Sequence, residues 1–139
     1  MSEPTPSAIF VYGTLQRGEE RERCWPKAPQ SIRPGYVFGE LYDLGPYPGL
    51  VIGHDRIAGE LWELADDDMA ITLFELDQVE CFGQGGVDLY ERRIVNCLLA
   101  DGTTIAAFTY FLADESFAKQ QRRVATNRDG YCRWHRFRK

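Results

Sequence analysis

The sequence predicts an α+β fold, a small, mixed and partly closed β-barrel with one or two flanking helices. Five segments have the alternating or β-branched patterns that are typical of strands, whereas only one segment has clear helical periodicity. Strands and helices do not alternate regularly, so the pattern does not indicate βαβ units. The chain has 139 residues, of which 44% are hydrophobic. That length is enough for one core, and we expect a single domain over residues 1–139.

The expected strands are residues 8–14, 35–44, 56–64, 90–99 and 103–112. The first (AIFVYGT) is rich in β-branched and aromatic residues and runs into a turn at Gly13. The last two form a hairpin, because Asp101-Gly102 between them is a typical hairpin turn. Residues 45–49 (GPYPG) predict a rigid irregular loop, since two prolines remove main-chain donors and fix φ.

A helix is expected from Asp66 onward. Residues 66–68 are all aspartate, which suits an N-terminal cap and first turn. Met69, Leu73 and Leu76 then recur at spacings of four and three and form an apolar stripe. At 100° per residue, Glu80 falls only about 20° from the line of Met69. Either the helix directs this carboxylate toward the apolar side, or it ends first and leaves Glu80 in solvent; periodicity alone does not decide.

The C-terminal segment, about residues 117–139, is basic although the whole chain has a net charge of −5. Such a segment can bind nucleic acid or another anion, or it can dock onto the acidic remainder of its own chain. We expect the second arrangement, with Gly130, Tyr131 and Trp134 as candidate anchors, and no nucleic-acid partner.

The cysteines at positions 24, 81, 97 and 132 form no C-x-x-C pair and fit no zinc-binding spacing. The first residues have no basic region or long apolar stretch, and no apolar run is long enough to span a bilayer. We therefore expect reduced thiols, a cytoplasmic location and no membrane association. We also expect no metal or other cofactor, and a monomer or weak homodimer.

Four segments carry a family resemblance when they are taken in order. They are Val11-Tyr12-Gly13-Thr14-Leu15, residues 39–50 (GELYDLGPYPGL), residues 59–64 (GELWEL), and residues 76–80 (LDQVE) followed by residues 90–93 (YERR). Together they resemble the gamma-glutamylcyclotransferase-like family, in its gamma-glutamylamine cyclotransferase and avirulence-induced-gene-like branch. Each segment is short, but their order makes the resemblance specific.

The resemblance implies a curved mixed sheet that closes towards a barrel. It also implies a reaction in which a small γ-glutamyl amide releases its amine while the glutamyl part cyclises to 5-oxoproline. Glu80 would be the general acid/base, and the main chain of Tyr12, Gly13, Thr14 and Leu15 would bind substrate. Two further candidates are Tyr90, which lines the pocket or fills the core, and Arg92, which contacts substrate or pairs with an acidic group of the fold.

These residue types suit that chemistry. The substrate's α-amine attacks its own γ-carbonyl, so no protein nucleophile or metal is needed, only alignment and a base. A half-buried carboxylate has a raised pKa, which lets it accept a proton and then return it to the leaving amine. Main-chain N–H groups in a glycine-containing turn can stabilise negative charge on the substrate.

Other functions stay open. A non-catalytic module on the same fold could bind a small carboxylate or another protein, but it would not need Glu80. A thiol enzyme would use Cys81 with His54 or His135, although no spacing pairs them. Three adjacent carboxylates at residues 66–68 suit a helix start better than a metal ion. Finally, the glycine-rich residues 82–88 are either a lid or a plain flexible loop.

Overall fold

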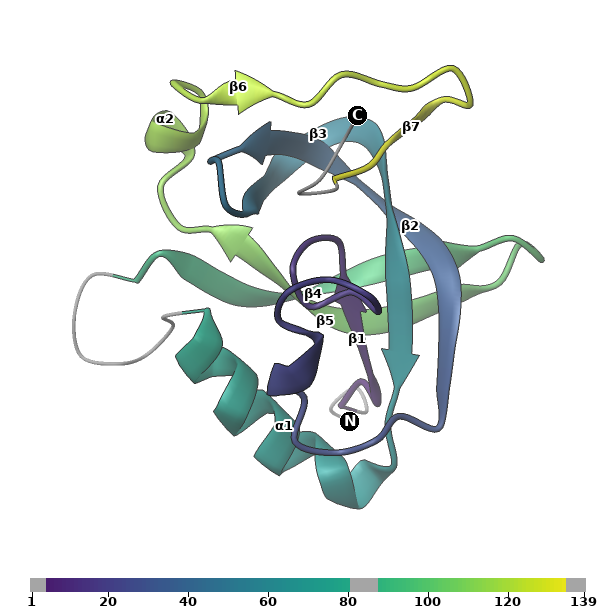
Figure 1. Cartoon of the computed structure of the whole chain (residues 1–139). Helices are drawn as coiled ribbons and strands as arrows, with labels where there is room; N and C mark the ends of the chain where they lie inside the picture. Colours follow the sequence, from purple (N-terminus) through teal and green to yellow (C-terminus); the bar gives the residue numbers. More distant parts are fainter. Residues whose placement is uncertain (1–4, 81–87, 135–139) are drawn as a thin grey trace.

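The computed structural model describes residues 5–80 and 88–134, and within them seven strands form one sheet in the order β6-β2-β4-β5-β1-β3-β7 (Figure 1). An additional pairing between β2 and β3 joins the sheet to itself, so β1 to β5 close into a barrel. The strands of this barrel are β1 (Ala8–Val11), β2 (Ser31–Asp43), β3 (Pro48–Glu63), β4 (Tyr90–Leu99) and β5 (Thr104–Leu112). The predicted α+β barrel is confirmed, and its ring is fully closed.

Strand β1 lies in the middle of the barrel wall, parallel to β5 and antiparallel to β3. Because successive side chains of a strand point to opposite faces, β1 contributes to two cores. Ala8 and Phe10 belong to the cluster inside the barrel, whereas Ile9 and Val11 belong to a second cluster on the other face. All four are buried. Burial on both faces explains why this segment is an unbroken apolar run.

The hairpin of β2 and β3 is longer than the sequence predicted. Strand β3 begins at Pro48, which pairs with Asp43, so the expected loop at residues 45–49 is wrong for its last two positions. Proline is tolerated there because the first residue of a strand need not donate to the ladder. Strands 35–44 and 56–64 were likewise predicted too short. Between Gly39 and Glu40 a β-bulge shifts the register, which lets the long hairpin bend around the barrel.

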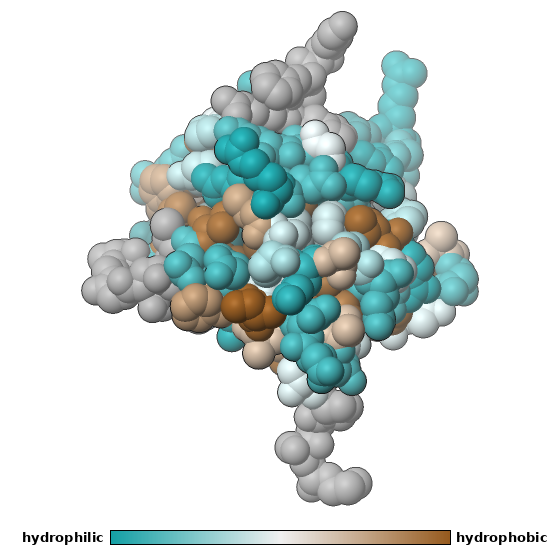
Figure 2. Space-filling view, turned by 60° about the horizontal axis from the view of Figure 1, so that its bottom comes forward, coloured by the Kyte–Doolittle hydropathy of each residue, from teal (hydrophilic) through white to brown (hydrophobic). Residues whose placement is uncertain are grey.

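Helix α1 (Asp66–Val79) packs against the outer face of the barrel, where Met69, Thr72 and Leu76 are buried. The three aspartates form its first turn as expected, but the N-cap residue is Ala65, which makes no side-chain cap. Outward-facing Phe74 is 61% exposed. On the face seen in Figure 2, hydrophobic patches alternate with hydrophilic side chains. The other helices are short: the 3-10 helix η1 (Glu22–Cys24) lies beside α1, and α2 (Glu115–Ala118) follows β5.

The basic C-terminal segment docks onto the barrel. Its strand β6 (Arg122–Arg123) pairs with β2, and its strand β7 (Tyr131–Cys132) pairs with β3 (Figure 1). Trp134 is buried in the cluster inside the barrel, and Arg123 forms an ion pair of 2.9 Å with Asp55 on β3. This arrangement agrees with the expectation that the segment contacts its own chain.

The described cysteines, at positions 24, 97 and 132, are free thiols. Within the same residues, no group of His, Cys, Asp and Glu side chains is arranged to hold a metal ion. The described helices also include none that is long and apolar enough to cross a membrane.

Candidate active site

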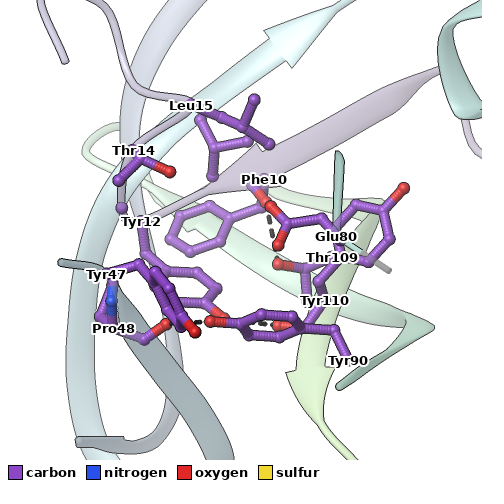
Figure 3. Close-up of a pocket in the computed structure, with 12 residues that line it drawn as sticks. Phe10, Tyr12, Thr14, Leu15, Tyr47, Pro48, Glu80, Tyr90, Thr109 and Tyr110 are labelled. Atoms are coloured by element: carbon purple, nitrogen blue, oxygen red, sulfur yellow. Dashed lines mark hydrogen bonds between the residues drawn. The ribbon is translucent and has the colours of Figure 1, made fainter. Parts of the chain in front are cut away.

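A pocket opens between the end of β1, the start of β3, the end of α1 and strands β4 and β5 (Figure 3). Together with the open space at its mouth, it has a volume of about 340 Å³. Its lining comes from segments far apart in the sequence, namely residues 10–15, Tyr47, Pro48, Glu80, Tyr90, Thr109 and Tyr110. Most of these side chains are apolar or aromatic, and Glu80 is the ionisable carboxylate among them.

Glu80 occupies the C-cap position of α1, directly after the last helical residue. The helix therefore ends before Glu80, yet the side chain does not point into open solvent: it is partly buried and lines the pocket (Figure 3). Burial raises the pKa of this carboxyl group to about 7, while the positive charge of Arg21 acts in the opposite direction. No described residue donates a hydrogen bond to the carboxylate. Near neutral pH such a group can both accept and give up a proton.

The turn after β1 forms the opposite side of the pocket. Gly13 contributes only main chain there, and it has no room for a side chain, since a Cβ atom would lie 2.7 Å from Pro48 Cγ. The Gly13 carbonyl accepts a hydrogen bond from the Gln16 N–H at 3.1 Å, which closes the turn. No described residue accepts a hydrogen bond from the N–H groups of Gly13, Thr14 or Leu15. Such donors suit an anionic group of a ligand.

Three tyrosines connect the walls of the pocket. The Tyr12 hydroxyl donates to the Tyr110 carbonyl at 2.6 Å, and the Tyr90 hydroxyl donates to the Pro48 carbonyl at 2.6 Å. Burial raises the pKa of Tyr12, Tyr90 and Tyr110, and the charge of Glu80 raises each further. The hydroxyls therefore remain protonated donors. Pocket lining and core packing were the alternatives for Tyr90, and here all three tyrosines are buried and line the pocket.

A second carboxylate, Asp77, lies one helical turn before Glu80 and is bound within the fold. The Tyr110 hydroxyl donates to Asp77 Oδ1 at 2.6 Å, and the Arg92 guanidinium forms an ion pair with Oδ2. Arg92 also lies over the Phe108 ring, 5.5 Å from its centre, and it is not among the lining residues. The structure thus shows the intramolecular partner that the sequence left open, whereas substrate contact by Arg92 stays a prediction.

The pocket is lined by most of the candidate site residues, namely Glu80, Tyr12, Gly13, Thr14, Leu15 and Tyr90, and their roles in a reaction stay predictions. Sequence reasoning missed Tyr47, Pro48 and Thr109 as lining residues. The Tyr47-Pro48 pair lies inside one of the four family-like segments and could have been found there. Thr109 gave no signal, because its hydroxyl acts through a tertiary contact, a 2.8 Å hydrogen bond to the Phe10 carbonyl.

The described residues do not support the thiol site or the metal site that the sequence analysis considered as alternatives. His54 is exposed on β3, and residues 66–68 form a helical turn that holds no candidate metal site. Cys81 and His135 lie outside the described residues, as do residues 82–87 of the glycine-rich segment.

A family model described as gamma-glutamyl cyclotransferase, AIG2-like, matches residues 9–136. The chain belongs to this family. It is 34% identical over 106 residues to gamma-L-glutamyl-butirosin B gamma-glutamyl cyclotransferase of Niallia circulans, an alignment covering 73% of this chain and 64% of the relative. A second relative, from Vibrio cholerae, is 41% identical over 76 residues, which is 52% of this chain and 60% of the relative. The chain thus spans less than two thirds of either curated relative.

Solved structures share the fold. An AIG2-like protein from Mus musculus superposes with a TM-score of 0.63 at 19% identity, covering 96% of this chain and 99% of that one. A protein from Arabidopsis thaliana gives a TM-score of 0.60 at 20% identity, covering 86% and 70% of the two chains. These likenesses extend over nearly the whole barrel.

Proposed function

We propose that the protein is a gamma-glutamyl cyclotransferase that releases an amine from a γ-glutamyl amide and converts the glutamyl part to 5-oxoproline. The observation that carries the proposal is that one pocket contains both Glu80, whose pKa is raised to about 7, and the main-chain N–H groups of residues 13–15, from which no described residue accepts a hydrogen bond. Family membership and the name of the Niallia circulans relative support the same reaction class.

In the proposed reaction the substrate's α-ammonium group gives a proton to the Glu80 carboxylate. The freed amine then attacks the γ-carbonyl carbon of the same molecule, forming the ring C–N bond and an oxyanion. When the oxyanion collapses, the original amide C–N bond breaks and the leaving nitrogen takes a proton from Glu80. Two protons pass in total from the α-nitrogen to the leaving nitrogen, and one carboxyl group can carry them in succession. No water, oxidant or metal enters the balance.

The remaining lining residues would hold the substrate in a bent conformation. Attack within one molecule is fast once the two groups are aligned, with effective molarities of about 10⁵ M or more. The N–H groups of residues 13–15 would bind the α-carboxylate or the developing oxyanion, and donors fixed before the reaction need no reorganisation. Glycine suits this turn, because a Cβ atom at position 13 would lie only 2.7 Å from Pro48 Cγ.

The test is release of 5-oxoproline from a panel of γ-glutamyl amides by the wild type and by Glu80→Gln. We expect release by the wild type and a loss of turnover in the variant, with thermal-shift binding of 5-oxoproline retained. Equal rates for both proteins would contradict the role of Glu80. Binding of 5-oxoproline without release from any amide would favour a non-catalytic carboxylate-binding module on the same fold.

A further inference from the structure

A second pocket lies on the outer face of the barrel, where strands β2, β3 and β4 meet the C-terminal strand β7. Its volume, including the open space at its mouth, is about 970 Å³. Tyr36 of β2 pairs with Ala58 of β3, and both line this pocket. Their neighbours Val37 and Ile57 belong to the cluster inside the barrel, so Tyr36 and Ala58 point outward. This pocket shares no lining residue with the candidate active site.

Most of the lining of this second pocket is apolar or aromatic. Ala58 and Leu98 offer aliphatic side chains, and Tyr36 and Tyr131 form an edge-to-face pair with ring centres 5.3 Å apart. The guanidinium carbon of Arg56 lies 5.8 Å from the centre of each tyrosine ring, and these cation–π contacts hold the pair in place. Such walls suit the apolar body of a small ligand.

Glu60 is the carboxylate among the lining residues. Its Oε1 atom accepts two hydrogen bonds, from the Arg17 main-chain N–H at 2.7 Å and from the Trp62 indole N–H at 3.1 Å. Its Oε2 atom accepts none from the part of the chain that the structure describes. The positive charge of the lining, on Arg133, forms an ion pair with Asp129. The pocket therefore contains a carboxylate oxygen that can accept a hydrogen bond from a ligand.

We propose that this pocket binds a primary amine carried on an apolar or aromatic body, with the ammonium group at Glu60. The tyrosine pair and Leu98 would contact the body of the ligand. An ammonium ion can donate a charge-assisted hydrogen bond to the carboxylate. A ligand carboxylate would instead meet a like charge, because Arg133 is already paired. The inference goes beyond the proposed reaction and does not depend on it.

Glu60 also connects this pocket to the candidate active site. Arg17, whose N–H donates to Glu60, directly follows the turn of residues 13–16. Gln16 lines the second pocket, and its side-chain amide donates to the Gly13 carbonyl at 3.2 Å. An amine at Glu60 would therefore contact the residues that hold the turn of the candidate active site.

The inference is tested with two probes, phenethylamine and phenethyl alcohol. The amine is an ammonium ion at neutral pH, whereas the alcohol has the same body and a neutral hydroxyl group. Binding to the full chain is followed by two-dimensional amide NMR. The Arg17 N–H and the Trp62 indole N–H should shift, because both donate to the carboxylate that the amine would contact. We expect the amine to bind roughly tenfold more tightly than the alcohol, the range of one charged hydrogen bond.

Three variants locate the amine. Glu60→Gln keeps an acceptor oxygen for the Arg17 and Trp62 N–H groups but removes the charge, so it should bind both probes with the affinity of the alcohol. Glu80→Gln is the matched control, because it makes the same change in the other pocket, and it should keep the wild-type ratio. Ala58→Leu adds bulk to the second pocket and should weaken the binding of both probes by a similar factor.

Two results would overturn the inference. One is the absence of amine binding, or equal affinities of the wild type for the two probes. The other is a preference for the amine that is lost in Glu80→Gln but kept in Glu60→Gln, which would place the amine in the candidate active site. If Glu60→Gln does not fold, Ala58→Leu still decides, since unchanged affinity for the amine would show that it binds elsewhere. None of these measurements depends on release of 5-oxoproline, so the proposed function is tested separately.

Discussion

Two carboxylates three residues apart at the end of α1 have opposite surroundings. Asp77 accepts a hydrogen bond from the Tyr110 hydroxyl and forms an ion pair with Arg92. Glu80 accepts no hydrogen bond from the described residues, and burial raises its pKa to about 7. The same chemical group thus has two different environments, which differ in the hydrogen-bond and ion-pair partners that surround it.

The comparison shows how a fold can place a carboxyl group with a raised pKa next to one that is bound within the structure. Hydrogen bonds and positive charge favour the ionised form of a carboxyl group, whereas burial without partners favours the neutral form. The contacts of Asp77 tie α1 to strands β4 and β5, which carry Arg92 and Tyr110. Because Glu80 is the C-cap residue of that helix, those contacts also fix where its side chain enters the pocket.

The largest expected difference between the two carboxylates is in catalysis. Glu80→Gln should lower kcat for 5-oxoproline release by about 10²- to 10⁴-fold, the usual contribution of a general acid/base. Asp77→Asn makes the same chemical change one turn earlier and should lower kcat less than about tenfold, since it removes a contact and not the proton carrier. Steady-state kinetics on one γ-glutamyl amide measure both. Similar losses of kcat in the two variants would mean that the different surroundings of Glu80 and Asp77 do not give them different roles in catalysis.

The next largest effect is on stability and depends on pH. The pKa of Glu80 is raised from 4.5 to about 7 in the folded protein, so the folded state binds this proton more tightly than the unfolded state. The resulting stabilisation is fully present below pH 4.5 and is lost as pH rises through 7. Over that window the wild type should lose up to about 3 kcal/mol relative to Glu80→Gln, because the shift is 1.36 kcal/mol per pKa unit.

Urea unfolding of both proteins at pH 5 and pH 8 measures this linkage. The groups shared by the two proteins cancel in the difference between their free energies of unfolding. We expect the free energy of unfolding of Glu80→Gln, relative to that of the wild type, to be higher at pH 8 than at pH 5. A difference that does not change with pH would show that the pKa of Glu80 is not raised.

The sequence pointed to Glu80 as a candidate site residue, but it did not predict the partners that bind Asp77 within the fold. Helical periodicity from Met69 placed Glu80 near the apolar side, and the family-like segments selected it as the acid/base. The pairing of Asp77 with Arg92 and Tyr110 gave no local signal, because those residues are 15 and 33 positions away. The effect of the Arg21 charge on the pKa of Glu80 gave no local signal either, because the two residues are far apart in the sequence.

Asp77 should in turn matter more than Glu80 for holding the fold together. Asp77→Asn should lower the free energy of unfolding by about 1–3 kcal/mol, since it breaks an ion pair whose side chains are only 25% and 17% exposed. Glu91→Gln is the matched control on β4. It removes the Glu91–Arg93 ion pair, whose side chains are 40% and 44% exposed, and should cost less than about 0.5 kcal/mol. Equal costs in chemical denaturation would contradict the difference in burial.

The smallest expected effect comes from the hydroxyl that connects Asp77 to the pocket wall. Tyr110→Phe removes the donor to Asp77 and should cost about 1.5 kcal/mol, because the acceptor is charged. Tyr90→Phe is a matched change in which the lost partner is the neutral Pro48 carbonyl, and it should cost about 1 kcal/mol. The sharper distinction comes from combining the two changes in one protein. In the Asp77→Asn background the cost of Tyr110→Phe should fall towards that of Tyr90→Phe, because the acceptor has lost its charge. A cost for Tyr110→Phe that is the same in the wild-type and Asp77→Asn backgrounds would show that its hydroxyl stabilises the fold by packing and not through the carboxylate.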